Sequence, residues 1–203
     1  MARSRKGRRP GSPDTQTEIL EAASREFTSR GYDGATIRGV ATAAGVDPAL
    51  VLHYFGSKEQ LFVATLRVPV NPAAIVRGVL DDADPGAMGE RLISAMLGVW
   101  DATAHRNPLI AVLRSIAGEG PVADTVRQFI ERSIIAAFAE RLPGPDPHLR
   151  AVLIGSQVVG LLLTRYVVRL EPLASADPAH LSAIYGPTIE RYAYGALPPA
   201  GAP

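Results

Sequence analysis

The feature that most constrains how this chain can fold is the stretch of residues 36–62, in which helix-starting and helix-ending residues alternate at short intervals. Thr36 is a favourable N-cap, and Gly45 stands where a helix that ends with a positive φ usually places its glycine. The residues between them carry an apolar face at helical spacing. That face consists of Ile37, Val40, Ala41 and Ala44. The sequence therefore predicts a short amphipathic helix that ends in a tight turn.

A second and a third helix follow directly. Asp47 is a good N-cap and Pro48 suits the first helical position, so we expect the second helix to start here and to end at Gly56. Ser57 and Gln60 have the spacing of a capping box, which begins the third helix. Two short helices joined by a glycine-containing turn form a helix-turn-helix, whose second helix lies in the DNA major groove. This stretch is therefore expected to bind double-stranded DNA.

The charge of the chain is distributed as DNA binding requires. Residues 1–67 hold 10 basic and 7 acidic side chains, a net of +3, whereas residues 68–203 hold 11 and 13, a net of −2. Residues 1–13 are rich in Arg, Gly, Pro and Ser and have nothing to bury, which predicts a disordered basic arm. Beside a helix-turn-helix we expect this arm to wrap the DNA. The alternative is a tail that only keeps the chain soluble.

Three groups of residues resemble the tetracycline-repressor (TetR) family of transcription regulators. They are Gly31-Tyr32-Asp33-Gly34-Ala35-Thr36, then Ala41, Ala44, Gly45 and Val46, and finally Tyr54, Phe55, Ser57, Lys58, Glu59 and Leu61. The resemblance is strong over residues 15–66 and looser over the rest, where it points to a branch associated with actinobacteria. It implies an all-α fold with an N-terminal three-helix helix-turn-helix DNA-binding domain (residues 14–67) and a C-terminal helical domain (residues 68–203) for ligand binding and dimerisation.

The outward side of the motif supplies the candidate DNA contacts. Arg38 can pair with guanine O6 and N7, and the resemblance supports a base contact from this position; the alternative is an arginine that is solvated or binds a phosphate. Lys58 occupies the family's phosphate-binding position at a helix N-terminus, where the helix amides add attraction. The family's phosphate-binding Tyr is replaced here by Leu52, so this contact is lost or Tyr54 provides it. The predicted DNA-binding residues are Thr36, Arg38, Asp47, Pro48, Ala49, Leu50, His53, Tyr54 and Lys58.

Composition excludes several other classes of protein. The chain has no cysteine, which excludes disulfides, thiolate metal sites and cysteine nucleophiles. Its 4 histidines are scattered, and the motifs of hydrolases, zinc proteases and nucleotide-binding enzymes do not occur. The basic N-terminus is followed by no apolar run, and the longest uncharged apolar run, residues 151–164, is too short to span a bilayer. We expect a cytoplasmic protein that is not an enzyme and binds no metal or cofactor.

Proline and glycine clusters divide the second domain into predicted helices. Residues 68–72 break the chain after the DNA-binding motif. The predicted helices span residues 72–82, 86–106, 108–117, 121–142 and 146–170, and a last helix follows residues 177–178 and ends at residue 194.

The helix of residues 146–170 is apolar on nearly all sides, so it must be covered on all sides. Its small residues allow another helix to approach closely. A second copy of the chain is expected to cover one face in a four-helix bundle with the last helix; the alternative is a helix that lies wholly inside one chain. The predicted dimer contacts are Ser156, Val159, Gly160, Leu163, Ile184 and Ile189, with Gln157, Thr164 and Arg165 as polar groups near them.

Residues 72–142 are expected to build a cavity for a small, mostly apolar effector. The candidate effector-binding residues are Met88, Met96, Trp100, His105, Leu113, Arg114 and Phe129. Any one of the apolar residues in this set has plain core packing as its alternative. The whole sequence thus predicts a homodimeric repressor that binds a palindromic operator and is released by a small molecule. The alternative is a DNA-binding repressor that has no effector.

Overall fold

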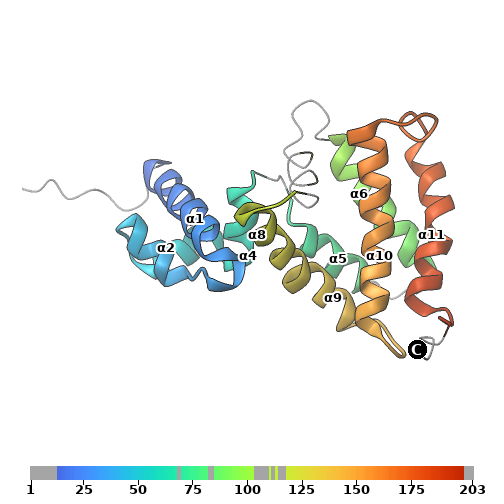
Figure 1. Ribbon diagram of the computed structural model, residues 1–203, viewed down its shortest axis with the longest axis horizontal. Helices are drawn as coiled ribbons and strands as arrows, with labels where there is room; N and C mark the ends of the chain where they lie inside the picture. The colour runs from blue at the N-terminus through green and yellow to red at the C-terminus, as the bar shows by residue number, and fades with distance from the viewer. Residues whose placement is uncertain are drawn as a thin grey trace, which may run out of the picture. The chain divides into compact units, whose positions relative to one another are not determined.

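A computed structural model describes residues 13–67, 70–81, 85–102, 110, 113 and 118–198 (Figure 1). These residues form helices and turns and contain no strand, so the predicted all-α fold is confirmed. The chain divides into two compact units, Met1–Arg67 and Val68–Pro203. The basic arm up to residue 12 and most of the helix predicted over residues 108–117 lie outside the described residues.

The first unit consists of α1 (Pro13–Gly34), α2 (Ile37–Ala44), α3 (Pro48–Phe55) and α4 (Lys58–Thr65). The first helix is interrupted at Gly31, the predicted stop, where φ is 71° and ψ is 175°. The rings of Phe27, Tyr32 and Phe62 pack together at the centre of this unit, with Tyr32 stacked on Phe27 at 5.9 Å and edge-on to Phe62 at 5.2 Å. Because α1 also packs against α2 and α4, the helix-turn-helix rests on a rigid apolar support.

The second unit is built around long helices that lie side by side. The structure shows α5 (Pro72–Leu80), α6 (Met88–Ala102), α8 (Pro121–Phe129), α9 (Ala136–Ala139), α10 (Pro147–Leu162) and α11 (Pro178–Tyr194). Helix α11 packs against both α6 and α10, and α5 packs against α6 and α9 (Figure 1). Asp177 starts α11 as an N-cap whose carboxylate accepts from the His180 N–H at 3.0 Å.

Two of the predicted helices contain π-helical turns that the sequence pattern does not indicate. Segment η3 (Ile130–Ile135) joins α8 to α9, and segment η4 (Leu163–Val168) extends α10. The helices predicted over residues 121–142 and 146–170 are therefore continuous over residues 121–139 and 147–168, with a wider turn inside each. Such turns are rare and occur frequently at functional sites.

Helices α6 and α11 cross with their backbones in direct contact. A Cβ atom added at Gly89 would clash with the Gly186 carbonyl, and one added at Gly186 would clash with the Glu90 side chain. The carboxylate of Glu190 accepts a hydrogen bond from the Gly89 N–H at 2.7 Å, which satisfies one of the free donors at the start of α6. This crossing requires a glycine on each helix.

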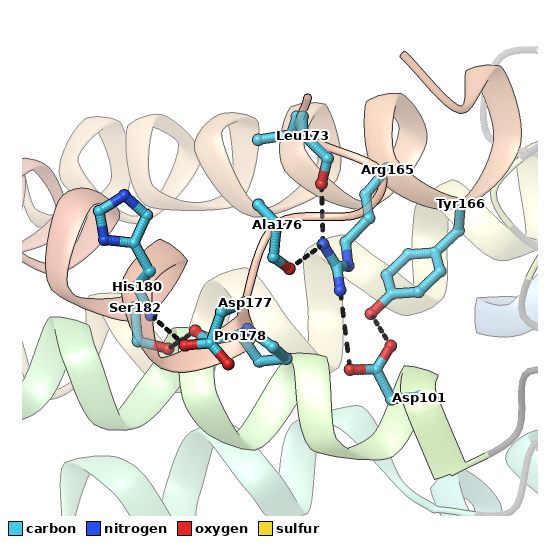
Figure 2. A network of polar contacts seen from close by, with 9 residues as sticks. All are labelled: Asp101, Arg165, Tyr166, Leu173, Ala176, Asp177, Pro178, His180 and Ser182. Atoms are coloured by element: carbon cyan, nitrogen blue, oxygen red, sulfur yellow. Dashed lines mark hydrogen bonds and ion pairs between the residues drawn. The ribbon is translucent and has the colours of Figure 1, made fainter. Parts of the chain in front are cut away.

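Two buried arginines fasten α10 and its extension to α11. At the start of α10, Arg150 donates from Nη1 to the carbonyls of Tyr192 at 2.8 Å and Gly195 at 2.9 Å, where α11 ends. At the other end, Arg165 in η4 donates from Nη1 to the carbonyls of Leu173 at 2.7 Å and Ala176 at 2.8 Å, in the turn before α11 (Figure 2). Arg165, which the sequence predicts as a polar group near the dimer interface, thus uses its guanidinium for hydrogen bonds inside the chain.

Candidate functional site

The turn between α2 and α3 forms as the sequence predicts. The Thr36 hydroxyl accepts from the Gly39 N–H at 2.9 Å, and Gly45 adopts the left-handed conformation with φ of 68° and ψ of 32°. The Val46 N–H donates to the Ala41 carbonyl at 3.0 Å, which closes the end of α2. Asp47 then accepts from the Ala49 N–H at 2.7 Å and starts α3. Local hydrogen bonds thus fix the angle between the two helices.

The junction between α3 and α4 differs from the prediction in one detail. The Ser57 hydroxyl accepts from the Gln60 N–H at 3.1 Å, as a capping box requires. The Ser57 N–H, however, donates to the Phe55 carbonyl at 2.8 Å, and the Gln60 side chain lies against Gly56. One of the two hydrogen bonds of a capping box therefore forms. The Ser57 N–H, which would donate to the Gln60 side chain in the full motif, is satisfied by the Phe55 carbonyl in the turn at Gly56.

The two faces of the motif separate as helical spacing predicts. The buried residues are Val40, Ala41, Val51 and Phe55, while Ile37, Ala44 and Val46 are half-buried. On the opposite side, Thr36, Arg38, Asp47, Ala49 and His53 are exposed, and Pro48 and Leu50 are half-buried. Leu52, which was not among the predicted DNA contacts, is 44% exposed and lies one turn after Ala49 on the same face of α3.

Lys58 is held against its own domain by two interactions. Its ammonium donates to the Asp33 carbonyl at 3.2 Å and lies over the Tyr32 ring, 4.7 Å from the centroid. Partial burial lowers the pKa of Lys58, and the nearby Asp33 carboxylate offsets part of that effect. These contacts place the ammonium at the N-terminus of α4, where a phosphate would also meet the helix amides.

Tyr54 does not present its hydroxyl to solvent. The oxygen is buried, and among the described residues it has no hydrogen-bond partner. The ring packs beside His53 at 5.6 Å and Phe55 at 6.3 Å. The prediction that Tyr54 donates to DNA is therefore not met by this conformation, because the hydroxyl lies inside the unit.

Three of the predicted effector-binding residues, Met88, Met96 and Trp100, lie along α6. Met88 and Trp100 are both buried, but they are separated by twelve residues, or about 18 Å of helix. A ligand that touched both would have to extend along α6, and the effector-binding set stays a prediction. Met96 is half-buried, Leu113 and Phe129 are buried, and His105 and Arg114 lie outside the described residues. Trp100 stacks on Tyr166 of η4 at 5.0 Å, a partner that the sequence analysis missed.

The predicted dimer contacts fall into two groups. Ser156 and Gly160 are exposed, Val159 and Leu163 are half-buried, and Ile184 is 53% exposed. Ile189 is 0% exposed, so its prediction is wrong. It faces the crossing of α6 and α11, where its Cβ lies 3.0 Å from the position of a Cβ added at Gly89, and it has no surface to offer a partner.

Other exposed apolar residues lie on the same two helices. Leu149 and Val152 lie on α10, and Tyr194 lies on α11. Helical spacing links Leu149 and Val152 to Ser156 and Gly160, which is the signal that could have identified them. The stretch Pro147–Val168 has a mean hydropathy of 1.7 and is long and apolar enough to cross a membrane by length and composition alone. Core helices of soluble proteins pass the same test.

No metal site is formed by the described part of the chain, which contains no cluster of three His, Cys, Asp or Glu side chains that could hold an ion. The polar groups that do gather in the second unit are Asp101, Arg165 and Tyr166, at the end of α6 and in η4 (Figure 2).

Comparison with known proteins agrees with this architecture. The family described as "Bacterial regulatory proteins, tetR family" matches residues 19–65, and "Tetracyclin repressor-like, C-terminal domain" matches residues 87–193. A TetR-family regulator from Streptomyces coelicolor A3 has a crystal structure that is 34% identical, covers 92% of this chain and 98% of that one, and superposes with a TM-score of 0.53.

Two curated relatives match over shorter spans. The HTH-type transcriptional regulator BetI of Rhizobium meliloti is 46% identical over 135 residues, which is 64% of this chain and 61% of BetI. The HTH-type transcriptional repressor AcnR of Corynebacterium efficiens is 36% identical over 81 residues, which is 35% of this chain and 43% of AcnR. In both cases the chain spans less than two thirds of the relative's length.

The two family matches cover the helix-turn-helix and the helical unit that follows it. Proteins of this kind are not enzymes, which agrees with the lack of catalytic motifs in the sequence. The chain belongs to the TetR family of DNA-binding transcriptional regulators.

Proposed function

We propose that this protein is a cytoplasmic repressor that binds a palindromic operator as a homodimer and is released by a small, mostly apolar effector. The observation that carries the proposal is the capped pair α2 and α3, which leaves Arg38, Ala49 and His53 exposed in the motif. An exposed arginine and a short helix with small and apolar outward residues suit the edges of guanine and the methyl groups of thymine.

The uncovered apolar face of α10 and α11 supports a homodimer. Val152 is 42% exposed and Ile184 is 53% exposed, and both helices belong to the same packed pair. A second copy of the chain would cover this face with the same two helices and form a four-helix bundle. One recognition helix reads only a few base pairs, so a two-fold dimer with half-sites about 34–36 Å apart would double the site.

Repression is supported by the name of a relative, the HTH-type transcriptional repressor AcnR, to which this chain is similar over 81 residues. Release by an effector is supported by the composition of the second unit. The end of α6 brings aromatic rings and ionisable groups together there, with Trp100 stacked on Tyr166 and the Tyr166 hydroxyl donating to Asp101 at 2.7 Å.

The DNA part of the proposal is tested on an operator selected from a random DNA pool. We expect the wild-type protein to bind this operator more tightly than scrambled DNA at physiological salt. Arg38→Ala should cost about 1–3 kcal/mol at one base position and relax the preference there. Lys58→Ala should weaken binding to all sequences and reduce the salt slope by about one. Arg169 is an exposed arginine of the second unit, so Arg169→Ala is the matched control. It should change neither the base preference nor the salt slope.

Two outcomes would contradict this. Equal binding to operator and scrambled DNA by the wild-type protein would exclude specific recognition. A uniform loss on all DNA with Arg38→Ala would make that residue a phosphate contact. Because Lys58 also contacts Tyr32 and Asp33, a thermal unfolding curve of each variant must show that the first unit remains folded.

A further inference from the structure

Leu52 is a large apolar side chain that the first unit leaves in solvent. It is 44% exposed, and no other large apolar residue among the described residues of that unit is exposed. Val51 is 0% exposed and Phe55 is 7% exposed, so α3 buries its inner face and turns Leu52 outward. Covering an exposed leucine with another apolar group is favourable. The position of Leu52 on α3 indicates which group could cover it.

Leu52 shares its face of α3 with Ala49 and His53, which are also exposed. Residues three or four positions apart in a helix lie on the same face, and helical side chains lean toward the N-terminus of their helix. Leu52 therefore leans toward Ala49, at the end of a recognition helix that contacts base edges. The two residues are about 4.5 Å apart along the helix axis, close to the spacing of about 3.4 Å between successive nucleotides of a DNA strand. Leu52 and Ala49 can therefore face neighbouring base pairs.

The outward face of α3 offers few hydrogen bonds to DNA. Ala49 and Leu52 have apolar side chains, and the Tyr54 hydroxyl is buried. The Asp47 carboxylate caps the helix by accepting from the Ala49 N–H at 2.7 Å. Of the eight residues of α3, all of which the structure describes, His53 is the one whose side chain presents an exposed hydrogen-bonding group. Recognition by the rest of this face therefore depends on apolar contact.

We propose that Leu52 is a specificity-determining residue that packs against the C5-methyl group of a thymine in each operator half-site. The inference rests on the proposed binding of operator DNA and names a feature of the bases that the protein reads. In the major groove the thymine methyl is the apolar group of a base edge, whereas the other bases present polar groups there. Burying a group of this size is worth about 0.8 kcal/mol, which is about fourfold in affinity.

Deoxyuridine tests the methyl group alone, because uracil keeps every hydrogen-bonding group of thymine and lacks only the methyl. The operator is selected from a random DNA pool, and each thymine of a half-site is replaced by deoxyuridine in turn, in both half-sites together. We expect replacement at one position to weaken binding by the wild-type protein about fourfold for each methyl group removed. Wild-type binding that is unchanged by deoxyuridine at every position would overturn the proposal.

Three variants assign the methyl contact to a residue. Leu52→Ala shortens the side chain and should bind the normal and the deoxyuridine operator with the same affinity. Leu52→Met keeps an apolar side chain of similar volume and should keep the preference of about fourfold for thymine. Leu170→Ala removes a leucine that is 55% exposed in the second unit, so it is the matched control and should behave like the wild-type protein. A Leu52→Ala protein that keeps the full preference for thymine would overturn the assignment to Leu52.

Leu52→Ala should fold, because the side chain is 44% exposed and alanine favours helices. Leu52→Gln, which has a polar side chain of similar length, is a second variant that loses the apolar contact. Its preference for thymine over uracil should likewise disappear, which keeps the assignment testable if Leu52→Ala is unstable. A folded Leu52→Gln protein that keeps the preference would also overturn the proposal.

The same titrations separate this inference from the proposed function. Wild-type protein that binds the operator no more tightly than scrambled DNA would reject both. Specific operator binding with equal affinity for thymine and uracil at every position would leave DNA recognition standing and reject the thymine contact alone. A methyl-group dependence that the wild-type and Leu52→Met proteins share, and that Leu52→Ala lacks, would support both.

Discussion

At the scale of single residues, the most unusual group in the DNA-binding unit is the hydroxyl of Tyr54. It is buried, and within the described part of the chain nothing accepts or donates to it. An unsatisfied buried polar group costs about 1–3 kcal/mol. The ring itself is well packed between His53 and Phe55. The aromatic ring therefore stabilises the fold, whereas the hydroxyl oxygen does not stabilise the DNA-free protein.

Tyr54→Phe is expected to raise the free energy of unfolding by about 1 kcal/mol, because it removes the unpaired oxygen and keeps the ring. Urea unfolding measures the change. Operator affinity should stay unchanged in the same variant. His53→Ala, at the exposed neighbouring position, is the control and should weaken operator binding while leaving stability nearly unaltered. If the folded Tyr54→Phe variant lost operator affinity, the result would show instead that the Tyr54 hydroxyl moves outward and contacts the DNA.

Residues whose roles depend on near neighbours in sequence could be predicted from the sequence, and residues whose roles depend on tertiary packing could not. Thr36, Gly45 and Asp47 act through hydrogen bonds to residues at most four positions away, so their types and spacing suffice. Ile189 and Arg165 were placed at an interface because each lies on an apolar helix. Their true contacts are with residues of other elements, which helical spacing does not reveal.

At the scale of elements, the crossing of α6 and α11 depends on how closely two backbones approach. Helix boundaries follow from proline and glycine and were predicted to within a few residues in α5, α10 and α11. Which helices cross, and at which residue, depends on the glycine pair Gly89 and Gly186. Neither glycine stands out in the sequence, because α6 also contains Gly98, which faces open space.

Gly89→Ala is expected to destabilise the second unit by about 1–3 kcal/mol, since its Cβ would meet the backbone carbonyl of Gly186 and the helices would have to separate. Gly98→Ala on the same helix is the matched control. Among the described residues nothing lies within 4 Å of its added Cβ, so the change acts through helix propensity, and stability should rise by about 0.5–1 kcal/mol. Thermal unfolding of the two variants measures both changes in stability. Equal effects at the two positions would mean that α6 and α11 are not in backbone contact.

At the scale of the whole molecule, the second unit has large apolar side chains on α10 and α11 that the described residues leave exposed. Arg150 and Arg165 fasten both ends of the α10 helix to the neighbourhood of α11, so the two helices present their outer faces as one rigid surface. Leu149, Val152 and Ile184 lie exposed on it. A rigid surface with large exposed apolar side chains is suited to a permanent partner, and a second copy of the chain supplies an identical surface.

Gly160→Glu tests whether that face joins two copies. Gly160 is exposed, and no described residue lies within 4 Å of an added Cβ, so the variant should fold, with a small gain in helix propensity. A glutamate there would place two charges in the centre of a two-fold interface. We expect monomers in sedimentation velocity and a loss of operator affinity of about 10²-fold or more, the range that linking two half-site contacts provides.

Gly98→Glu, which is equally open on α6, is the control and should remain a dimer with full operator affinity. A dimeric Gly160→Glu protein would place the interface away from α10 and α11, whereas monomers that keep full operator affinity would show that one recognition helix is sufficient.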